Sequence, residues 1–287
     1  MRGPQTGILI MALAAVCFSC SDIGIKVLGG NLSPWQIAAG RGFFGMLVIL
    51  IAIRFRVRGL IVKQWPCQMF LGTAGAFGFT FFIFSIKYLP LSIAMPLGYI
   101  YPAIGALISP FINQEKPGRD DWVAIGLAMT AVICLSQGAS SQVGENFLPG
   151  LVFGLLGAFF VGLMINLARR QTQTVILSVN LFYLYFSNFL VGLIMSLVFD
   201  DQLVPPMPDL AKLFLFIAPM AIIGFSLMFV AYRYISAHRG GIVMTLEAAA
   251  ATLYGLFILH EPVTLPVVLG GVLILLSGVV IIRSSIN

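Results

Sequence analysis

Apolar stretches of about 20 residues, each long enough to cross a bilayer as a helix, follow one another along this chain of 287 residues. Hydrophobic residues make up 60% of the chain and charged residues 9%, against roughly 45–50% and 25% in soluble domains. A water-soluble globule cannot hide this much apolar surface. The sequence therefore predicts an all-α integral membrane protein.

Ten such segments can be placed, and the connections between them are short. They cover residues 6–27, 34–54, 66–87, 91–112, 121–138, 148–168, 175–199, 212–234, 240–259 and 264–283. The first segment is not followed by the small-residue cleavage pattern of a secretory signal, so we expect it to be retained as a transmembrane helix.

The chain also repeats itself. Residues 79–115 and 225–261 match in register at an offset of 146 residues, with identities at Phe79/Phe225, Tyr88/Tyr234, Ala103/Ala249, Leu107/Leu253, Phe111/Phe257, Ile112/Ile258 and Glu115/Glu261. We expect two five-helix repeats, covering residues 1–139 and 146–287. Because five is odd, the second repeat must enter the membrane inverted relative to the first. Inverted repeats are typical of secondary transporters.

The distribution of Lys and Arg predicts the orientation, because cytoplasmic loops retain positive charge. With a cytoplasmic N-terminus, the inner side receives twelve of the sixteen basic residues. We therefore expect a multi-pass protein of the bacterial inner membrane with both termini in the cytoplasm.

Few ionisable groups lie inside the apolar segments, where each costs several kcal/mol unless it faces a partner or water. A helical rise of 1.5 Å per residue places Asp22 about 8 Å and Arg41 about 10 Å below the outer boundary of the membrane. We expect the two to pair, with Lys26 one turn above Asp22. The pair is either a structural ion pair or a contact for a polar substrate or a coupling proton. Lys26 alone also fits a residue that reaches the interface.

Glu247 is the third buried charge. The same estimate places it about 10 Å from the inner face, too far from Arg41 in depth to be its obvious partner. A carboxyl group there has three possible roles: it takes a proton, pairs with a cation of the protein, or meets a cationic group on the substrate.

The fourth segment carries prolines at positions 96 and 102, which cannot donate backbone hydrogen bonds and predict a kinked or open helix. Tyr99 and Tyr101 lie at this point, and Tyr101 is the repeat mate of Glu247. Interrupted helices at matching positions of two halves point to a transport site, although a kink without a site also fits. Asn166 is a further candidate, either lining the pathway or bonding between helices.

Several classes of function are excluded. The net charge of +6 comes from basic residues scattered singly, so we expect no nucleic-acid partner. Metalloprotease and serine-hydrolase motifs are absent and the chain has two His, so we expect no enzyme, metal or cofactor. A membrane-embedded enzyme, or a receptor or channel without a transport cycle, is the alternative.

The chain resembles the EamA-type family of the drug/metabolite transporter superfamily. The resemblance covers nearly its whole length and rests on the ten-segment pattern and on the residues Cys20-Ser21-Asp22, Lys26, Ser33-Pro34-Trp35-Gln36, Arg41, Glu115 and Glu261-Pro262. It implies a carrier of small organic solutes with a central cavity between the first, third, fourth, sixth, eighth and ninth helices. Members of this family move amino acids, riboflavin, S-adenosylmethionine or metallophores, in either direction.

The repeats differ at the charged positions, because Ile165 and Leu184 stand where Asp22 and Arg41 would be expected in the second repeat. A symmetric charged site is therefore not expected. The sequence predicts an alternating-access carrier of a small polar or zwitterionic solute, acting as a monomer or homodimer and coupled to protons or working by exchange. The expected substrate-binding residues are Asp22, Arg41, Glu247, Tyr99, Tyr101 and Asn166.

Overall fold

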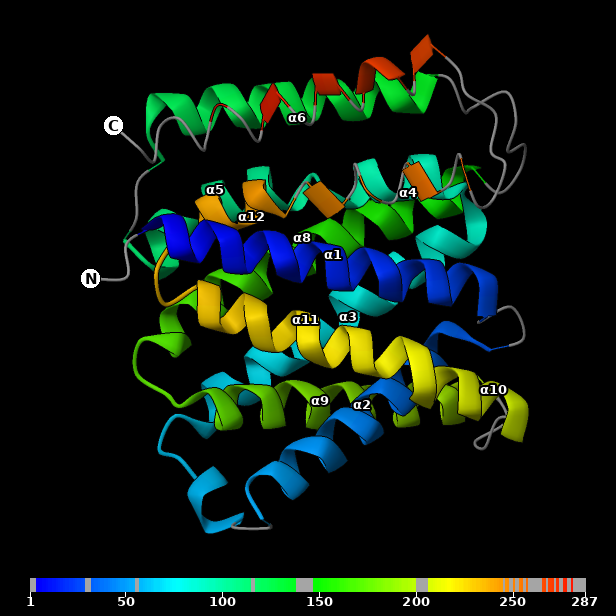
Figure 1. Ribbon diagram of the computed structural model, residues 1–287, viewed down its shortest axis with the longest axis vertical. Coiled ribbons are helices and arrows are strands. Elements are labelled where there is room, and N and C mark those ends of the chain that lie inside the picture. The colour runs from blue at the N-terminus through cyan, green and yellow to red at the C-terminus, as the bar shows by residue number, and fades with distance from the viewer. Residues whose placement is uncertain are drawn as a thin grey trace.

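The computed structural model describes residues 4–28, 32–54, 57–114, 117–137, 147–199 and 206–244, together with short pieces between 246 and 280. Every element within these ranges is helical, as the sequence predicts (Figure 1). The elements are α1 (Pro4–Leu28), α2 (Pro34–Ala52), η1 (Val57–Leu60), α3 (Trp65–Tyr88), α4 (Leu91–Gly98), α5 (Tyr101–Ile112), α6 (Arg119–Gln137), α8 (Phe147–Thr172), α9 (Leu177–Val198), α10 (Met207–Lys212), η3 (Leu213–Ile217), α11 (Ala218–Ala231) and α12 (Ala237–Val243).

Six continuous helices in the described ranges are long and apolar enough to cross a membrane. They are Pro4–Lys26, Pro34–Ala52, Trp65–Tyr88, Phe147–Thr172, Leu177–Val198 and Met207–Ala231. The last begins before the predicted start at residue 212, because α10 already starts at Met207 with a proline in its first turn. About half of the predicted ninth and tenth segments, and also Glu115 and Glu261, lie outside the described residues.

The fourth predicted segment is broken in two. Helix α4 ends at Gly98, a turn covers Tyr99 and Ile100, and α5 begins at Tyr101. Pro102 in the first turn of α5 has no N–H, so it favours a helix start at this point. The predicted interruption is confirmed. Helix α12 stops at a corresponding place, with a turn at Met244, which is the repeat mate of Gly98.

The helices pack in a pattern that crosses between the two halves of the chain. Helix α3 packs along α8, α1 along α11, and α2 along α9. In Figure 1, α1 crosses the middle of the bundle, while α6 and α2 lie at opposite edges. Glycines permit the closest approaches: at Gly42 of α2, a Cβ atom would overlap the backbone of Phe189 in α9. This is the small-residue packing that membrane helices use.

Candidate functional site

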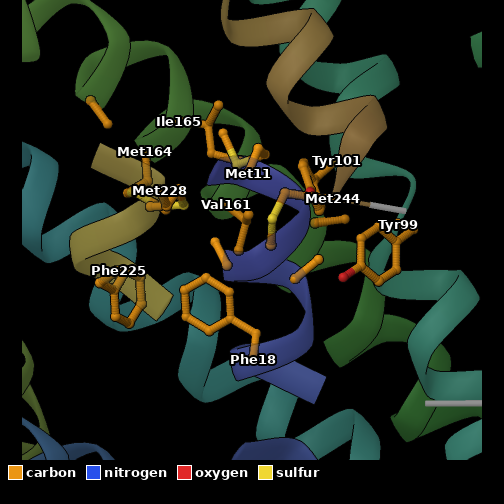
Figure 2. Packing of buried hydrophobic residues seen from close by; sticks show 14 of the residues in the cluster. Met11, Phe18, Tyr99, Tyr101, Val161, Met164, Ile165, Phe225, Met228 and Met244 are labelled. Carbon is orange, nitrogen blue, oxygen red and sulfur yellow. The ribbon is translucent and has the colours of Figure 1, made fainter. Parts of the chain in front are cut away.

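A narrow cavity of about 50 Å³ lies inside the bundle. Its walls come from α1, α2, α3, α4, α5, α8, α11 and the stretch that follows α12, and they consist of Phe18, Ser21, Asp22, Arg41, Phe79, Phe82, Gly98, Tyr99, Tyr101, Gly157, Ala158, Val161, Met164, Ile165, Met228, Met244 and Glu247. Figure 2 shows aromatic and methionine side chains packed together around this region, among them the lining residues Phe18, Met164 and Met228. Apolar walls with a few polar groups are typical of small-molecule sites.

Three ionisable groups from three separate segments face this cavity. Asp22 comes from α1, Arg41 from α2 and Glu247 from the stretch after α12. Each is almost fully buried, with 8%, 6% and 7% of its surface exposed. The Asp22 and Glu247 carboxyl groups are hydrogen-bond partners, and the Arg41 guanidinium acts electrostatically on both. Asp22 and Arg41 thus meet at one cavity, as the matched depths predict.

The predicted separation of Glu247 from Arg41 in depth was wrong. That estimate assumed a continuous helix from Gly240 onward, with a constant rise per residue. The structure has a break instead, because α12 ends at Val243 and Met244 forms a turn. Glu247 lines the same cavity as Asp22 and Arg41.

The two tyrosines of the interrupted segment form one wall of the cavity. Their ring centroids lie 5.3 Å apart, and both rings are nearly buried. The Tyr99 side chain is a hydrogen-bond partner of the Glu247 carboxyl group. The Tyr101 hydroxyl donates to the backbone oxygen of Gly241 in α12, at 3.2 Å. Tyr99 therefore contacts the charged groups, while Tyr101 joins the two broken segments.

Arg41 is held by two phenylalanines that are mates in the sequence repeat. Its guanidinium carbon lies 5.7 Å from the ring centroid of Phe79 and 6.0 Å from that of Phe225. The two rings meet edge to face at 4.9 Å, and Phe18 contacts Phe225 in the same way at 4.8 Å. Such cation–π contacts stabilise a desolvated guanidinium. The sequence analysis recorded the Phe79/Phe225 identity but did not assign it to the site.

The start of α2 places Arg41 two turns inside the helix. The Ser33 hydroxyl accepts from the backbone N–H of Gln36 at 3.1 Å, and the Gln36 side chain accepts from the backbone N–H of Ser33 at 2.7 Å. Together they form a capping box, and Pro34 occupies the first helical position. This local sequence fixes where α2 begins and therefore the depth of Arg41.

Two polar atoms at the cavity have no hydrogen-bond partner among the described residues. They are Oδ2 of Asp22 and Nε of Arg41, both of which are buried. Buried polar groups are normally hydrogen-bonded, and an unpaired one is costly. The cavity thus presents one free acceptor and one free donor that a ligand or water can satisfy.

Asn166 lies outside the cavity lining. Its Nδ2 group donates to the backbone oxygens of Gly105 and Gly162, at 3.0 and 2.9 Å, and its Oδ1 accepts from Asn113 at 2.9 Å. These bonds join α8 to α5 and engage both ends of the side chain. The geometry therefore favours the helix-bonding alternative for Asn166.

The sequence profile of the EamA-like transporter family matches the chain twice, over residues 5–137 and 148–283. The chain belongs to this family. It is accordingly a multi-pass membrane protein, and the expected resemblance is confirmed. Within this EamA-like protein, the cavity lies between the helices that the resemblance implies, with α2 added through Arg41.

Curated relatives of this EamA-like protein are named as transporters. The pseudopaline exporter CntI of Pseudomonas aeruginosa is 22% identical over 98% of this chain and 97% of the relative. The S-adenosylmethionine uptake transporter of Rickettsia conorii is 23% identical over 98% of this chain and 93% of the relative. A known crystal structure superposes with a TM-score of 0.75 at 18% identity, covering 96% of each chain, which shows a shared fold.

Two basic residues of the EamA-like bundle hold the ends of neighbouring helices. The Lys26 ammonium on α1 donates to the backbone oxygens of Ile86 and Leu89, at 2.7 and 3.1 Å, where α3 ends. The Arg169 guanidinium on α8 donates to the backbone oxygen of Tyr232, where α11 ends. Cations at helix C-termini satisfy free carbonyls and oppose the helix dipole. Neither contact was predicted, because the acceptors are backbone oxygens, which no sequence pattern distinguishes.

Proposed function

We propose that this protein is a secondary-active carrier of the inner membrane that moves a small polar organic solute by alternating access. The observation that carries the proposal is the buried cavity, in which Asp22, Arg41 and Glu247 meet beside two interrupted segments. Intramembrane charges that face a cavity mark substrate and ion pathways. Broken helices at matched positions supply the polar groups of such sites.

The proposed architecture is two inverted five-helix repeats, residues 1–139 and 146–287. Equivalent contacts in the two halves support it. Residues of the first two helices correspond to residues 143 positions later in the second half, and residues of the third helix to residues 146 positions later. Gly7 of α1 packs against Ile235, and its mate Gly150 of α8 packs against Leu89, the mate of Ile235. Likewise, Phe18 of α1 packs against Gly224, and Val161 of α8 against Gly78. Each contact thus recurs with the halves exchanged.

The contacts of Lys26 and Arg169 with helix ends also recur with the two halves exchanged. Lys26 and Arg169 are mates, and so are Ile86 and Tyr232. Because Gly7 at the start of α1 contacts Ile235 near the end of α11, the Arg169 contact lies at the opposite end of the bundle from the Lys26 contact. We name the two contacts the Lys26 latch and the Arg169 latch. One latch at each end supports a cycle in which each opens in turn.

In this proposal, Asp22, Glu247 and Tyr99 contact the substrate, Arg41 balances charge, and Tyr101 shapes the cavity wall. Asn166 acts through packing. The relatives named for pseudopaline and for S-adenosylmethionine support a small organic solute as substrate. The coupling is to protons or by exchange.

The proposed topology places both termini in the cytoplasm and the connection near Gln142 outside. The charge distribution supports it, as the inner side then holds most of the Lys and Arg residues. Reporter fusions at Gln142 test this topology. Activity of an externally active reporter is expected, and a cytoplasmic Gln142 connection would contradict the inverted arrangement.

Reconstitution tests the proposed function. Liposomes that contain the purified protein are loaded with a metabolite pool that includes amino acids, vitamins and S-adenosylmethionine. The metabolites released and those retained are then compared by mass spectrometry. We expect selective, saturable movement of a few related solutes compared with protein-free liposomes. Failure of every pool to move, in either direction and with or without a proton gradient, would contradict the carrier.

A further inference from the structure

The charges facing the cavity do not balance. Two carboxyl groups, Asp22 and Glu247, face it together with one guanidinium, that of Arg41. When all three are ionised, the described lining holds one net negative charge inside the membrane. An uncompensated charge in such a place is costly, so the occupied cavity needs one further positive charge.

Arg41 is in position to act as an internal counter-ion. Its guanidinium contacts the rings of both Phe79 and Phe225, which come from α3 and α11, and the Tyr185 side chain of α9 also acts on it electrostatically. Phe79 and Phe225 occupy equivalent positions in the two halves. A charge held equally by both halves keeps its surroundings when the halves exchange conformations. Arg41 therefore remains in place as one fixed positive charge.

The pair of carboxyl groups, Asp22 and Glu247, has hydrogen-bonding capacity that is not used. Asp22 retains an unpartnered oxygen, Oδ2, although 92% of this residue is buried. That oxygen requires a donor. Tyr99 faces Glu247, and Tyr101 lies beside Tyr99, so two aromatic rings border the carboxyl groups. Carboxylates bordered by aromatic rings suit a cationic group carried on an apolar body.

Arg41 adds a second requirement. Its Nε atom is a buried donor without a hydrogen-bond partner in the described part of the chain. A solute that also carries an acceptor, such as a carboxylate, satisfies this atom, whereas a purely cationic solute leaves it unpaired.

From these observations we infer that the substrate of this carrier is an amphoteric organic solute with one net positive charge, whose cationic group binds between Asp22 and Glu247. This inference rests on the proposed function and specifies its substrate class. In the empty cavity, a proton shared by the two hydrogen-bonded carboxyl groups supplies the missing charge. The other titratable groups of the described lining are Arg41, Tyr99 and Tyr101, and none of them is a carboxylate that could accept that proton. Binding of the solute therefore releases it.

Thermal-shift measurements on the purified full-length protein test the charge requirement. The probes are two matched pairs, L-arginine with L-citrulline and S-adenosylmethionine with S-adenosylhomocysteine, in which the second compound lacks one positive charge at nearly the same shape. A broad metabolite pool, sorted by net charge, is measured beside them. We expect the stabilising compounds to carry one net positive charge, with a preference of about tenfold or more over neutral counterparts.

Variants test whether the carboxyl pair causes this preference. Glu247→Gln removes one negative charge, so neutral amphoteric solutes should bind about as well as their cationic counterparts. Asp22→Asn should have the same effect and serves as an independent second variant if one of them fails to fold. Asp120→Asn is the matched control, because it removes an exposed carboxyl group in the first turn of α6 and should preserve the wild-type preference.

The outcomes separate this inference from the proposed function. Wild-type binding of neutral or anionic solutes without preference for cations would overturn the charge requirement and leave a carrier of another specificity. A preference that persists in both carboxyl variants would overturn the role of Asp22 and Glu247. If no solute of any charge class binds or is transported, the proposed function fails together with the inference.

Discussion

Lys26 and Arg169 make equivalent contacts at opposite ends of the bundle, each donating to a carbonyl oxygen at the end of a helix in its own half of the chain. The acceptors, Ile86 and Tyr232, are separated by 146 residues, the offset of the sequence repeat. In a carrier built from inverted repeats, such a pair holds both ends of the pathway closed. Breaking one contact should open one end.

Loss of a latch should therefore bias the conformational equilibrium in a direction set by which latch is lost. A hydrogen bond from a charged donor contributes about 1.5–3 kcal/mol, which corresponds to a shift of roughly tenfold or more. With a Ser21→Cys reporter in a background without the native cysteines, an impermeant maleimide should label Lys26→Ala faster from outside and Arg169→Ala faster from inside.

Lys212→Ala provides the control for this labelling experiment. Lys212 pairs with Asp209 one turn away on the same helix, at 2.9 Å, so its removal breaks no contact between helices there. Labelling should match the unmodified reporter protein. Equal acceleration from both faces in either latch variant would show that the contact provides general stability and does not act as a gate.

Removal of Arg41 should destabilise the protein through the carboxyl groups that it leaves behind. Breaking one side of a buried charge cluster typically costs about 3–5 kcal/mol. We expect a loss of this order for Arg41→Gln in equilibrium unfolding in mixed micelles. The double variant Arg41→Gln/Glu247→Gln should recover much of the loss, because it removes one of the two carboxyl groups. Additive losses would indicate that Arg41 and Glu247 are not coupled.

Solute binding should depend on the contact between the planar guanidinium of Arg41 and the aromatic rings beside it. Lys keeps the charge but not the planar group that stacks on aromatic faces. Arg41→Lys and Phe225→Leu should each weaken solute binding by several-fold, with roughly 0.5–2 kcal/mol at stake in each cation–π contact. Isothermal titration with the transported solute measures this effect. Phe214→Leu, on an exposed ring outside the cavity, is the control.

Close packing of α2 on α9 should make Gly42 sensitive to a single methyl group. A Cβ atom there would overlap the backbone nitrogen of Phe189 and lie 2.7 Å from the backbone oxygen of Tyr185. Since backbone atoms cannot move aside cheaply, Gly42→Ala should cost about 1–3 kcal/mol. Gly126→Ala in α6, where a Cβ atom meets nothing within 4 Å, should be neutral or stabilising by up to about 1 kcal/mol. Unfolding of the two variants in mixed micelles makes the comparison, and equal stabilities would contradict it.

The sequence predicted the parts of the structure that depend on local chemistry. The prolines at positions 96 and 102 indicated the interruption around Tyr99, and the helix rise placed Asp22 and Arg41 at matching depth. The structure agrees with each of these predictions. Both predictions depend only on residues within single segments and on regular helix geometry.

Features that depend on a helix break without a proline, or on hydrogen bonds to backbone oxygens, were not predicted. Glu247 was placed at the wrong depth because the break at Met244 does not follow from a proline in that segment. The Lys26 and Arg169 contacts involve backbone oxygens, which no sequence pattern distinguishes. The contact of Arg41 with both Phe79 and Phe225 could not be predicted without knowing that these two repeat mates meet in space.

Counterflow in liposomes tests the central claim most directly, using the solute identified by reconstitution. Liposomes containing the protein are loaded with unlabelled solute and diluted into a trace of labelled solute, so that only a carrier that alternates between faces accumulates the label. We predict saturable accumulation by the wild type and Asp120→Asn, and its loss in the Asp22→Asn/Glu247→Asn variant despite normal folding. Undiminished counterflow in that double variant would contradict the claim that transport passes through this cavity.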